Sequence, residues 1–223
     1  MGVRRLLTVA LGLAVLAAPI QAAQATDPTV TLSGPTTATD GDSLVYSITV
    51  HNGGGGNLSI TWAPVGATPV TEPVADGVED TGDQPLTYRL PMYVNTTVTA
   101  TLGSVTSSLT VKVRPQISTI VRTPHQTYRR YAVISAGNVP AFRSTIAPYI
   151  AHRCLTFEVQ RLRSGVWRRV VLTGCRAEDS KGRVFWSWAG SHPSNVSFRI
   201  RSAFRGDTEN VAANGPFTYF RFG

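Results

Sequence analysis

The two cysteines of this chain, Cys154 and Cys175, are the residues whose type and spacing point most directly to chemistry. Paired thiols can form a disulfide, carry out redox exchange or bind a metal ion. A redox or metal site made of this pair and His152 needs further ligands and a C-x-x-C or similar spacing, and neither is present. In an exported chain, a single intramolecular disulfide is the expected outcome. The sequence therefore predicts a structural disulfide between Cys154 and Cys175.

A hairpin would bring the two cysteines together. If the chain folds back at Ser164 and Gly165, the cysteines lie opposite each other, and the turn contains a glycine that tolerates a positive φ angle. The same register pairs apolar residues across the strands: Val159 with Val170, Phe157 with Leu172, and Leu162 with Trp167. Because the cysteines alternate with Leu155 and Phe157, we expect the disulfide on the outer side of the hairpin unless a bulge shifts it.

Arginine is the second residue type that could do chemistry. In the register above Arg161 lies opposite Arg168, and like charges that face each other across a ladder are destabilising. An anion that bridges them would remove the repulsion, and guanidinium groups suit phosphate and carboxylate. The candidate anion-binding residues are Arg161, Arg163, Arg168, Arg169, Arg129 and Arg130, with Arg199 and Arg201 as further members. Two alternatives stay open, a solvated surface and a face that docks on an acidic part of the chain.

Two further groups of residues allow other hypotheses. The acidic side chains Asp76, Glu79, Asp80 and Asp83 could bind Ca²⁺ through carboxylate oxygens. Their spacing does not match that of a dedicated calcium loop, so we predict no metal site. Six aromatic residues could form a platform for sugar rings, although we expect most of them in the core. They are Trp167, Trp186, Trp188, Phe217, Tyr219 and Phe222.

The sequence gives no indication of catalysis. The four histidines are scattered, and the G-x-S-x-G, H-E-x-x-H and phosphate-loop motifs are absent from the sequence. We therefore expect no enzyme activity, no catalytic residues and no cofactor.

The chain that must position these residues begins with features of a secretory signal peptide over residues 1–25. Arg4 and Arg5 precede an apolar run of about fifteen residues, which is shorter than the roughly 20 that a membrane span needs. The charge then changes sign along the chain. Residues 27–114 hold three basic and eight acidic side chains, whereas residues 115–223 hold sixteen and five. A change this abrupt, beside Arg114 and Pro115, predicts an acidic domain over 28–114 and a basic domain over 115–223.

Both segments have the period-two alternation of half-buried strands. In the first, Leu44, Tyr46, Ile48 and Val50 share one face, and Trp62 is expected to be the core aromatic. Residues 64–85, rich in proline and acidic side chains, are expected to form a loop. In the second, Val196, Phe198 and Ile200 alternate with polar residues, and residues 217–222 are expected to form a last aromatic strand. Several short strands with turns between them predict two β-sandwiches.

Residues 115–223 also resemble the repeated Ig-like modules of secreted bacterial proteins. The matching pieces, in order, are Val159-Gln160-Arg161, Gly165-Val166-Trp167, Asp179 to Gly182, Phe198-Arg199-Ile200-Arg201 and Phe204-Arg205-Gly206-Asp207. They match that family's V-x-L-Q-R strand, G-x-W hairpin, D-x-x-G turn, Y/F-R-V-R strand and F-x-G-D loop. The cysteine pair and the surplus of arginines depart from this pattern. The resemblance implies a noncatalytic spacer, stalk or binding unit, without site residues to transfer.

The sequence thus predicts an all-β protein with two consecutive Ig-like antiparallel sandwiches after a signal peptide. We expect it to be secreted or associated with the cell envelope, with no transmembrane segment in the mature chain. The predicted partner is a cell-envelope polyanion or polysaccharide that contacts the arginines. The alternative is an exported inhibitor or effector that binds a protein partner through loops of a sandwich.

Overall fold

The computed structural model describes residues 26–223 except 83 and 191. Every regular element in this part of the chain is a β-strand, which confirms the predicted all-β fold class. The predicted signal peptide lies outside the described residues. Within them, no helix has the length and apolar character that crossing a membrane requires.

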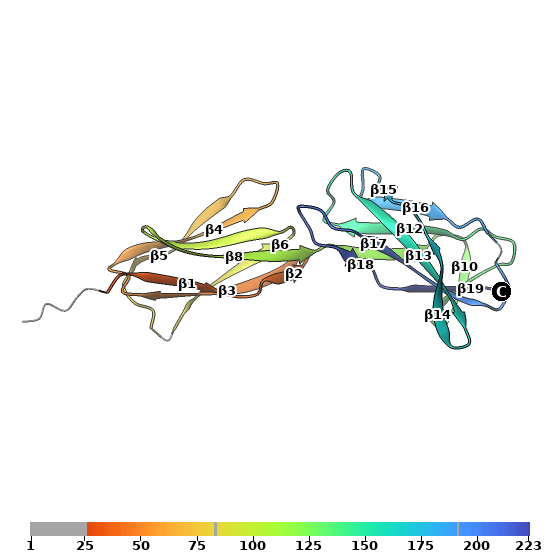
Figure 1. Ribbon diagram of the computed structural model, residues 1–223, viewed down its shortest axis with the longest axis horizontal. Coiled ribbons are helices and arrows are strands. Elements are labelled where there is room, and N and C mark those ends of the chain that lie inside the picture. Colours follow the sequence, from red (N-terminus) through yellow and green to blue (C-terminus); the bar gives the residue numbers. More distant parts are fainter. Residues whose placement is uncertain (1–25, 83, 191) are drawn as a thin grey trace, which may run out of the picture.

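The first half of the chain forms a sandwich of two sheets (Figure 1). The smaller sheet has the order β1-β3-β6, with β1 (Thr29–Ser33), β3 (Asp42–His51) and β6 (Leu86–Met92). The larger sheet has the order β2-β8-β7-β4-β5, with β2 (Thr37–Thr39), β8 (Val105–Arg114), β7 (Thr96–Leu102), β4 (Gly56–Pro64) and β5 (Val70–Val78). The predicted alternation holds in β3, where Tyr46 and Ile48 are fully buried and Val45 is 41% exposed.

Two details of this sandwich differ from the sequence-based prediction. Tyr46, not Trp62, is the fully buried aromatic residue, and burial raises the pKa of its hydroxyl to about 12. Trp62 lies close to the end of β4, so it only packs against the margin of the core. The expected loop over residues 64–85 contains strand β5, which pairs with β4. The hydroxyls of Thr61 on β4 and Thr71 on β5 form a hydrogen bond between these two strands.

The second half of the chain forms another sandwich. Its smaller sheet has the order β16-β12-β9, with β16 (Arg183–Ser187), β12 (Ala141–Ala147) and β9 (Gln116–Val121). The larger sheet has the order β10-β11-β19-β17-β13-β14, with β10 (His125–Tyr128), β11 (Tyr131–Ile134), β19 (Thr218–Phe222), β17 (Ser197–Phe204), β13 (Cys154–Arg163) and β14 (Val166–Leu172). Two short strands extend it, β15 (Arg176–Ala177) on β13 and β18 (Ala213–Asn214) on β17.

The two halves repeat one strand order. The sheet β1-β3-β6 corresponds to β9-β12-β16, and β2-β8-β7-β4-β5 corresponds to β11-β19-β17-β13-β14. Each larger sheet also contains one parallel pair, β2 with β8 and β11 with β19. This two-sheet order, with strands exchanged between the sheets, is the connectivity of immunoglobulin-type sandwiches. The buried apolar residues form one cluster in each half. We therefore propose that residues 28–114 and 115–223 are separate domains.

The junction between the sandwiches is short and hydrogen-bonded. Only Pro115 separates β8 from β9. The fully buried Asn210 donates from Nδ2 to the carbonyl oxygens of Tyr93 and Val113, at 3.1 Å each, and its Oδ1 accepts from Nη2 of the buried Arg153 at 2.6 Å. Arg153 is held in turn by Asp207, at 2.8 Å. Because the side-chain amide of Asn210 and the guanidinium of Arg153 both have partners in this network, the network holds the two sandwiches end to end (Figure 1).

Candidate functional site

The β13–β14 hairpin turns at the predicted residues. Ser164 and Gly165 have φ angles of 47° and 78°. Two positive φ angles in a two-residue loop are typical of a type I′ turn, which suits the twist of a hairpin. Next to the turn the strands follow the predicted register, and Leu162 lies opposite Trp167.

Farther from the turn, a β-bulge shifts the register by one residue. Val159 pairs with Val171, because Val171 packs against the core while Val170 is 44% exposed. A bulge of this kind places two residues of one strand opposite a single residue of the other. The predicted pairs Val159–Val170 and Phe157–Leu172 are therefore wrong.

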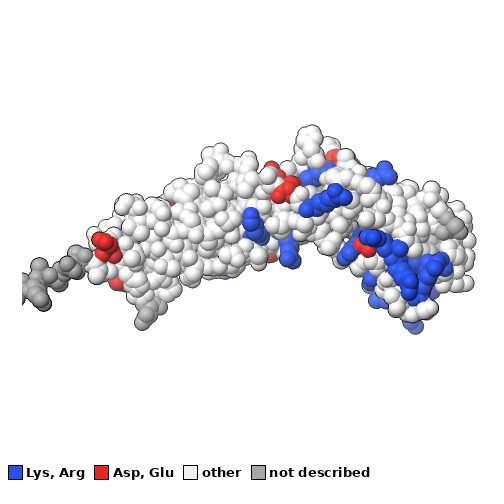
Figure 2. All heavy atoms as spheres, in the orientation of Figure 1, with Lys and Arg blue, Asp and Glu red and all other residues white. Residues whose placement is uncertain are grey.

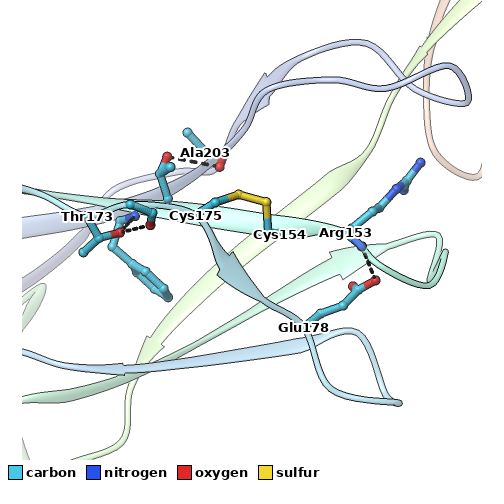
Figure 3. Close-up of a disulfide and its surroundings, with 9 residues drawn as sticks. Arg153, Cys154, Thr173, Cys175, Glu178 and Ala203 are labelled. Atoms are coloured by element: carbon cyan, nitrogen blue, oxygen red, sulfur yellow. Dashed lines mark hydrogen bonds between the residues drawn. A yellow bond between two sulfur atoms is a disulfide. The ribbon is translucent and has the colours of Figure 1, made fainter.

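The disulfide between Cys154 and Cys175 is formed, which confirms the prediction (Figure 3). The two Cα atoms lie 5.4 Å apart, within the usual range for such a bond. Because the neighbouring Leu155 is fully buried, Cys154 points to the outer side of the sheet. Thr173 closes the hairpin beside the bond, since its hydroxyl accepts a hydrogen bond from the Phe157 amide at 2.9 Å. Both sulfur atoms are bonded, so neither is a free ligand for a metal.

The six candidate arginines do not form one surface. Arg161 lies opposite Arg168 of β14 and opposite Phe198 of β17. Phe198 is buried in the core, so these residues lie on the core side of the sheet. Arg163, two residues after Arg161, lies on the same side at the end of the hairpin. We call Arg161, Arg163 and Arg168 the reverse face of the hairpin.

A second set of arginines lies on the outer side of the same sheet. Arg169 and Arg199 both lie opposite Gln160, and Arg201 lies opposite Glu158. Figure 2 shows Lys and Arg side chains gathered over the β13–β14 hairpin. We call the outer set the arginine face: Arg130, Arg169, Arg199, Arg201 and Arg221.

Aromatic rings hold the guanidinium groups of this face. The Arg199 guanidinium carbon lies 3.9 Å from the ring centre of Phe217 and 4.6 Å from that of Trp167. The Arg130 guanidinium lies 4.2 Å from the ring centre of Tyr219. Cation–π contacts of this kind keep the planar guanidinium flat against the ring. Its orientation is therefore set before any ligand binds.

The β10–β11 turn forms one edge of the arginine face. Arg129 and Arg221 both contact the Tyr128 ring, with guanidinium carbons 5.5 and 4.8 Å from its centre. Arg129 has a positive φ angle of 54°, as residues of such tight turns often have. The structure thus brings Arg130 onto the arginine face with Arg169 and Arg129 to the edge of that face, but neither of them to Arg161, Arg163 or Arg168.

Glu158 is the acidic residue within this face. Its carboxylate accepts hydrogen bonds from Arg201 at 2.8 Å and from Gln160 at 2.6 Å, and Gln160 in turn accepts from Arg199. Burial acts to raise the pKa of Glu158, but the bonds from Gln160 and Arg201 outweigh it, so this pKa lies below its ordinary value. With five arginines and one carboxylate, the face carries an excess of four positive charges at neutral pH.

The six aromatic candidates divide between core and surface. Phe222 is buried in the core, and the partly buried Trp186 and Trp188 pack against it. The ring centres of Trp186 and Phe157 lie 5.4 Å apart in a stacked arrangement. The other three, Trp167, Phe217 and Tyr219, lie on the outer side beneath arginines. Arg221 was missed by sequence reasoning, although its alternation with the buried Phe220 and Phe222 is a signal for this position.

The acidic side chains proposed for calcium are spread over β5 and the turn after it. Asp76 lies on β5, whereas Asp80 forms an ion pair with His51 at 3.4 Å and accepts a hydrogen bond from the Gly82 amide. Asp83 lies outside the described residues. Among the residues that the structure describes, no three His, Cys, Asp or Glu side chains are grouped so as to hold a metal ion.

Comparisons with known proteins give no family. No family model and no curated protein matches the chain. Among solved structures, a CARDB domain from Pyrococcus furiosus, in complex with di-metal ions, is 18% identical and covers 39% of this chain and 92% of its own, with a TM-score of 0.27. A marsupial T cell receptor is 10% identical and covers 88% of this chain and 73% of its own, with a TM-score of 0.31. These scores are too low to assign a fold, so the architecture rests on the strand order above.

Proposed function

We propose that this chain is a noncatalytic, secreted or envelope-associated Ig-like protein that binds polyanions through the arginine face. The observation that carries this proposal is the set of four arginines on strands β14, β17 and β19 and a fifth in the β10–β11 turn, with a single carboxylate among them. Phosphate, sulfate and carboxylate groups suit the guanidinium fork. Guanidinium groups already held on rings lose less freedom when they bind, which strengthens the interaction.

The geometry favours an anionic ligand over a neutral sugar. A sugar platform needs exposed ring faces, but guanidinium groups lie over Trp167, Phe217 and Tyr219. A neutral sugar would have to displace these arginines, whereas an anion can bind the edges of the guanidinium groups where they already lie. An acidic polysaccharide or another envelope polyanion is therefore the ligand class that fits this surface.

Binding of dextran sulfate by the mature chain tests the proposal. We expect the variant Arg130→Ser, Arg169→Ser, Arg221→Ser to weaken binding at low salt by about tenfold or more, and to lower the salt slope of log K by about 2 to 3. A matched control with the same change in charge is Arg122→Ser, Arg143→Ser, Arg176→Ser, none of which belongs to the arginine face. Equal binding by the two variants would overturn the proposal.

The salt dependence also separates polyanion binding from the rival function. Binding to phosphate, sulfate or carboxylate polymers falls steeply as salt rises, because bound counterions compete. An exported inhibitor or effector with an apolar contact would keep its affinity for a protein partner in high salt. Val166 and Leu172 of the hairpin, 55% and 56% exposed, are the apolar residues that such a partner would contact.

A further inference from the structure

Each sandwich ends its larger sheet with a charged edge strand. β5 is the outermost strand in the first half, and β14 holds the equivalent position in the second half. Acidic residues lie along β5 and directly after it, namely Glu72, Asp76, Glu79 and Asp80. Basic residues lie along β14 and at the end of its hairpin, namely Arg163, Arg168 and Arg169. The two equivalent edges thus carry opposite charges.

These charges are mostly unpaired within one chain. Among the described residues, only one ion pair includes any of these side chains, and it is the pair between Asp80 and His51. Asp76, Glu79, Arg163 and Arg168 are all exposed. Both edges therefore present charge that a partner can neutralise.

One chain cannot bring its own two edges together. Figure 1 places β5 and β14 in different sandwiches, well separated along the molecule. The junction network of Asn210 and Arg153 fixes the sandwiches end to end. The hydrogen bonds that cross between the halves involve residues beside this junction, such as Asn95 with Thr208. The complementary edge must come from another molecule.

We propose that the chain associates head to tail with a second copy, the acidic β5 edge of one molecule contacting the basic β14 edge of the next. Exposed valines lie on both edges, with Val70 at 42% and Val170 at 44% exposure, and add an apolar component. The contact joins two different surfaces, so a pair of molecules keeps one free acidic edge and one free basic edge. Such heterologous contacts give open chains of molecules unless the rotation closes a ring.

Side chains, not a continuous sheet, make this contact. Charged residues, proline and bulges on edge strands hinder the addition of another strand. β5 contains Pro73, and register shifts interrupt both β4–β5 and β13–β14. The association is therefore electrostatic, and it weakens with salt. It goes beyond the proposed polyanion binding, because two of the three arginines of this edge, Arg163 and Arg168, lie on the reverse face and only Arg169 belongs to the arginine face.

Sedimentation velocity of the mature chain tests the association. At about 50 mM salt we expect the weight-average sedimentation coefficient to rise continuously with protein concentration, and at about 500 mM salt we expect a monomer. The variant Asp76→Lys, Glu79→Lys and the variant Arg163→Glu, Arg168→Glu should each stay monomeric at low salt. The first variant leaves its β5 edge with no net charge beside a basic β14 edge, and the second variant has two edges of net negative charge, so neither keeps a pair of edges of opposite net charge.

Mixing the two variants provides the internal control. An equimolar mixture brings the intact basic β14 edge of the first variant together with the intact acidic β5 edge of the second, so a mixed dimer should form at low salt. A wild-type chain that stays monomeric at low salt, a wild-type chain that stops at a closed dimer, or a mixture that stays monomeric would each overturn the inference. The outcome is independent of the polyanion proposal, because Asp76→Lys, Glu79→Lys leaves the arginine face intact and should still bind dextran sulfate.

Discussion

At the scale of single residues, three of the five carboxylates of the second sandwich form ion pairs with arginines. Asp179 contacts Arg183, Glu158 contacts Arg201 and Asp207 contacts Arg153. Residues 115–223 hold sixteen basic side chains against five acidic ones, so these pairs leave most arginines without a carboxylate. The surplus supplies both the arginine face and the reverse face of the hairpin.

Asp179 makes the stability of this sandwich change with pH in the acid range. Hydrogen bonding from Arg183 lowers the pKa of Asp179 from 3.8 to about 2. Its stabilising effect is therefore complete above pH 3.8 and is lost as the pH falls towards 2. We expect Asp179→Asn to be less stable than the wild type in urea at neutral pH, with the difference disappearing near pH 2. A difference that is the same at both pH values would contradict this role of the charge.

At the scale of elements, the hairpin separates what the sequence could predict from what it could not. The turn at Ser164 and Gly165 and the disulfide followed from residue types and symmetric spacing. The bulge did not, because Val170 and Val171 are equally apolar and either could face the core. Only packing of the folded sheet selects Val171.

The sequence predicts only part of the candidate site, for a reason similar to the one that hides the bulge. Arginines and aromatic residues were each recognised, but the aromatic residues were expected mainly in the core. Along β19 nearly every residue is aromatic or basic, so the apolar pattern does not say which side is inside. The structure puts Phe220 and Phe222 in the core, and this turns Tyr219 and Arg221 outward.

The disulfide stabilises the hairpin element in a measurable way. It closes a loop with a sequence separation of 21 residues. A loop of about this size corresponds to about 3 kcal/mol on the chain-entropy model. We expect the double variant Cys154→Ser, Cys175→Ser to keep its fold and to lose about this much free energy of unfolding in guanidinium titrations. Reduced wild-type protein should behave like the variant, and unchanged stability in both would rule out this contribution.

At the scale of the whole molecule, the junction decides whether the two sandwiches act as one body. Asn210 satisfies two backbone carbonyls of the first sandwich and the guanidinium of Arg153 in the second. Pro115, the single residue between β8 and β9, limits rotation because its ring fixes φ. A fixed arrangement is also what the head-to-tail contact requires, since it keeps β5 away from β14 of the same chain.

Asn210→Ala tests the junction directly. The change removes the hydrogen bonds that Asn210 makes with the carbonyl groups of Tyr93 and Val113 and with the Arg153 guanidinium, at a cost of about 1 to 3 kcal/mol. Asp207 still holds Arg153, and the Val211 amide still donates to the Val113 carbonyl. We expect a lower unfolding midpoint and, in pulsed electron spin resonance with one label on each sandwich, a broader distribution of distances. Asn138→Ala, at an exposed asparagine, is the control and should change neither. If Asn210→Ala kept the narrow distribution of the wild type, the orientation would have to be held by Pro115 and the Asn95 contacts instead, since Asn95 also bridges the halves through the Thr208 carbonyl.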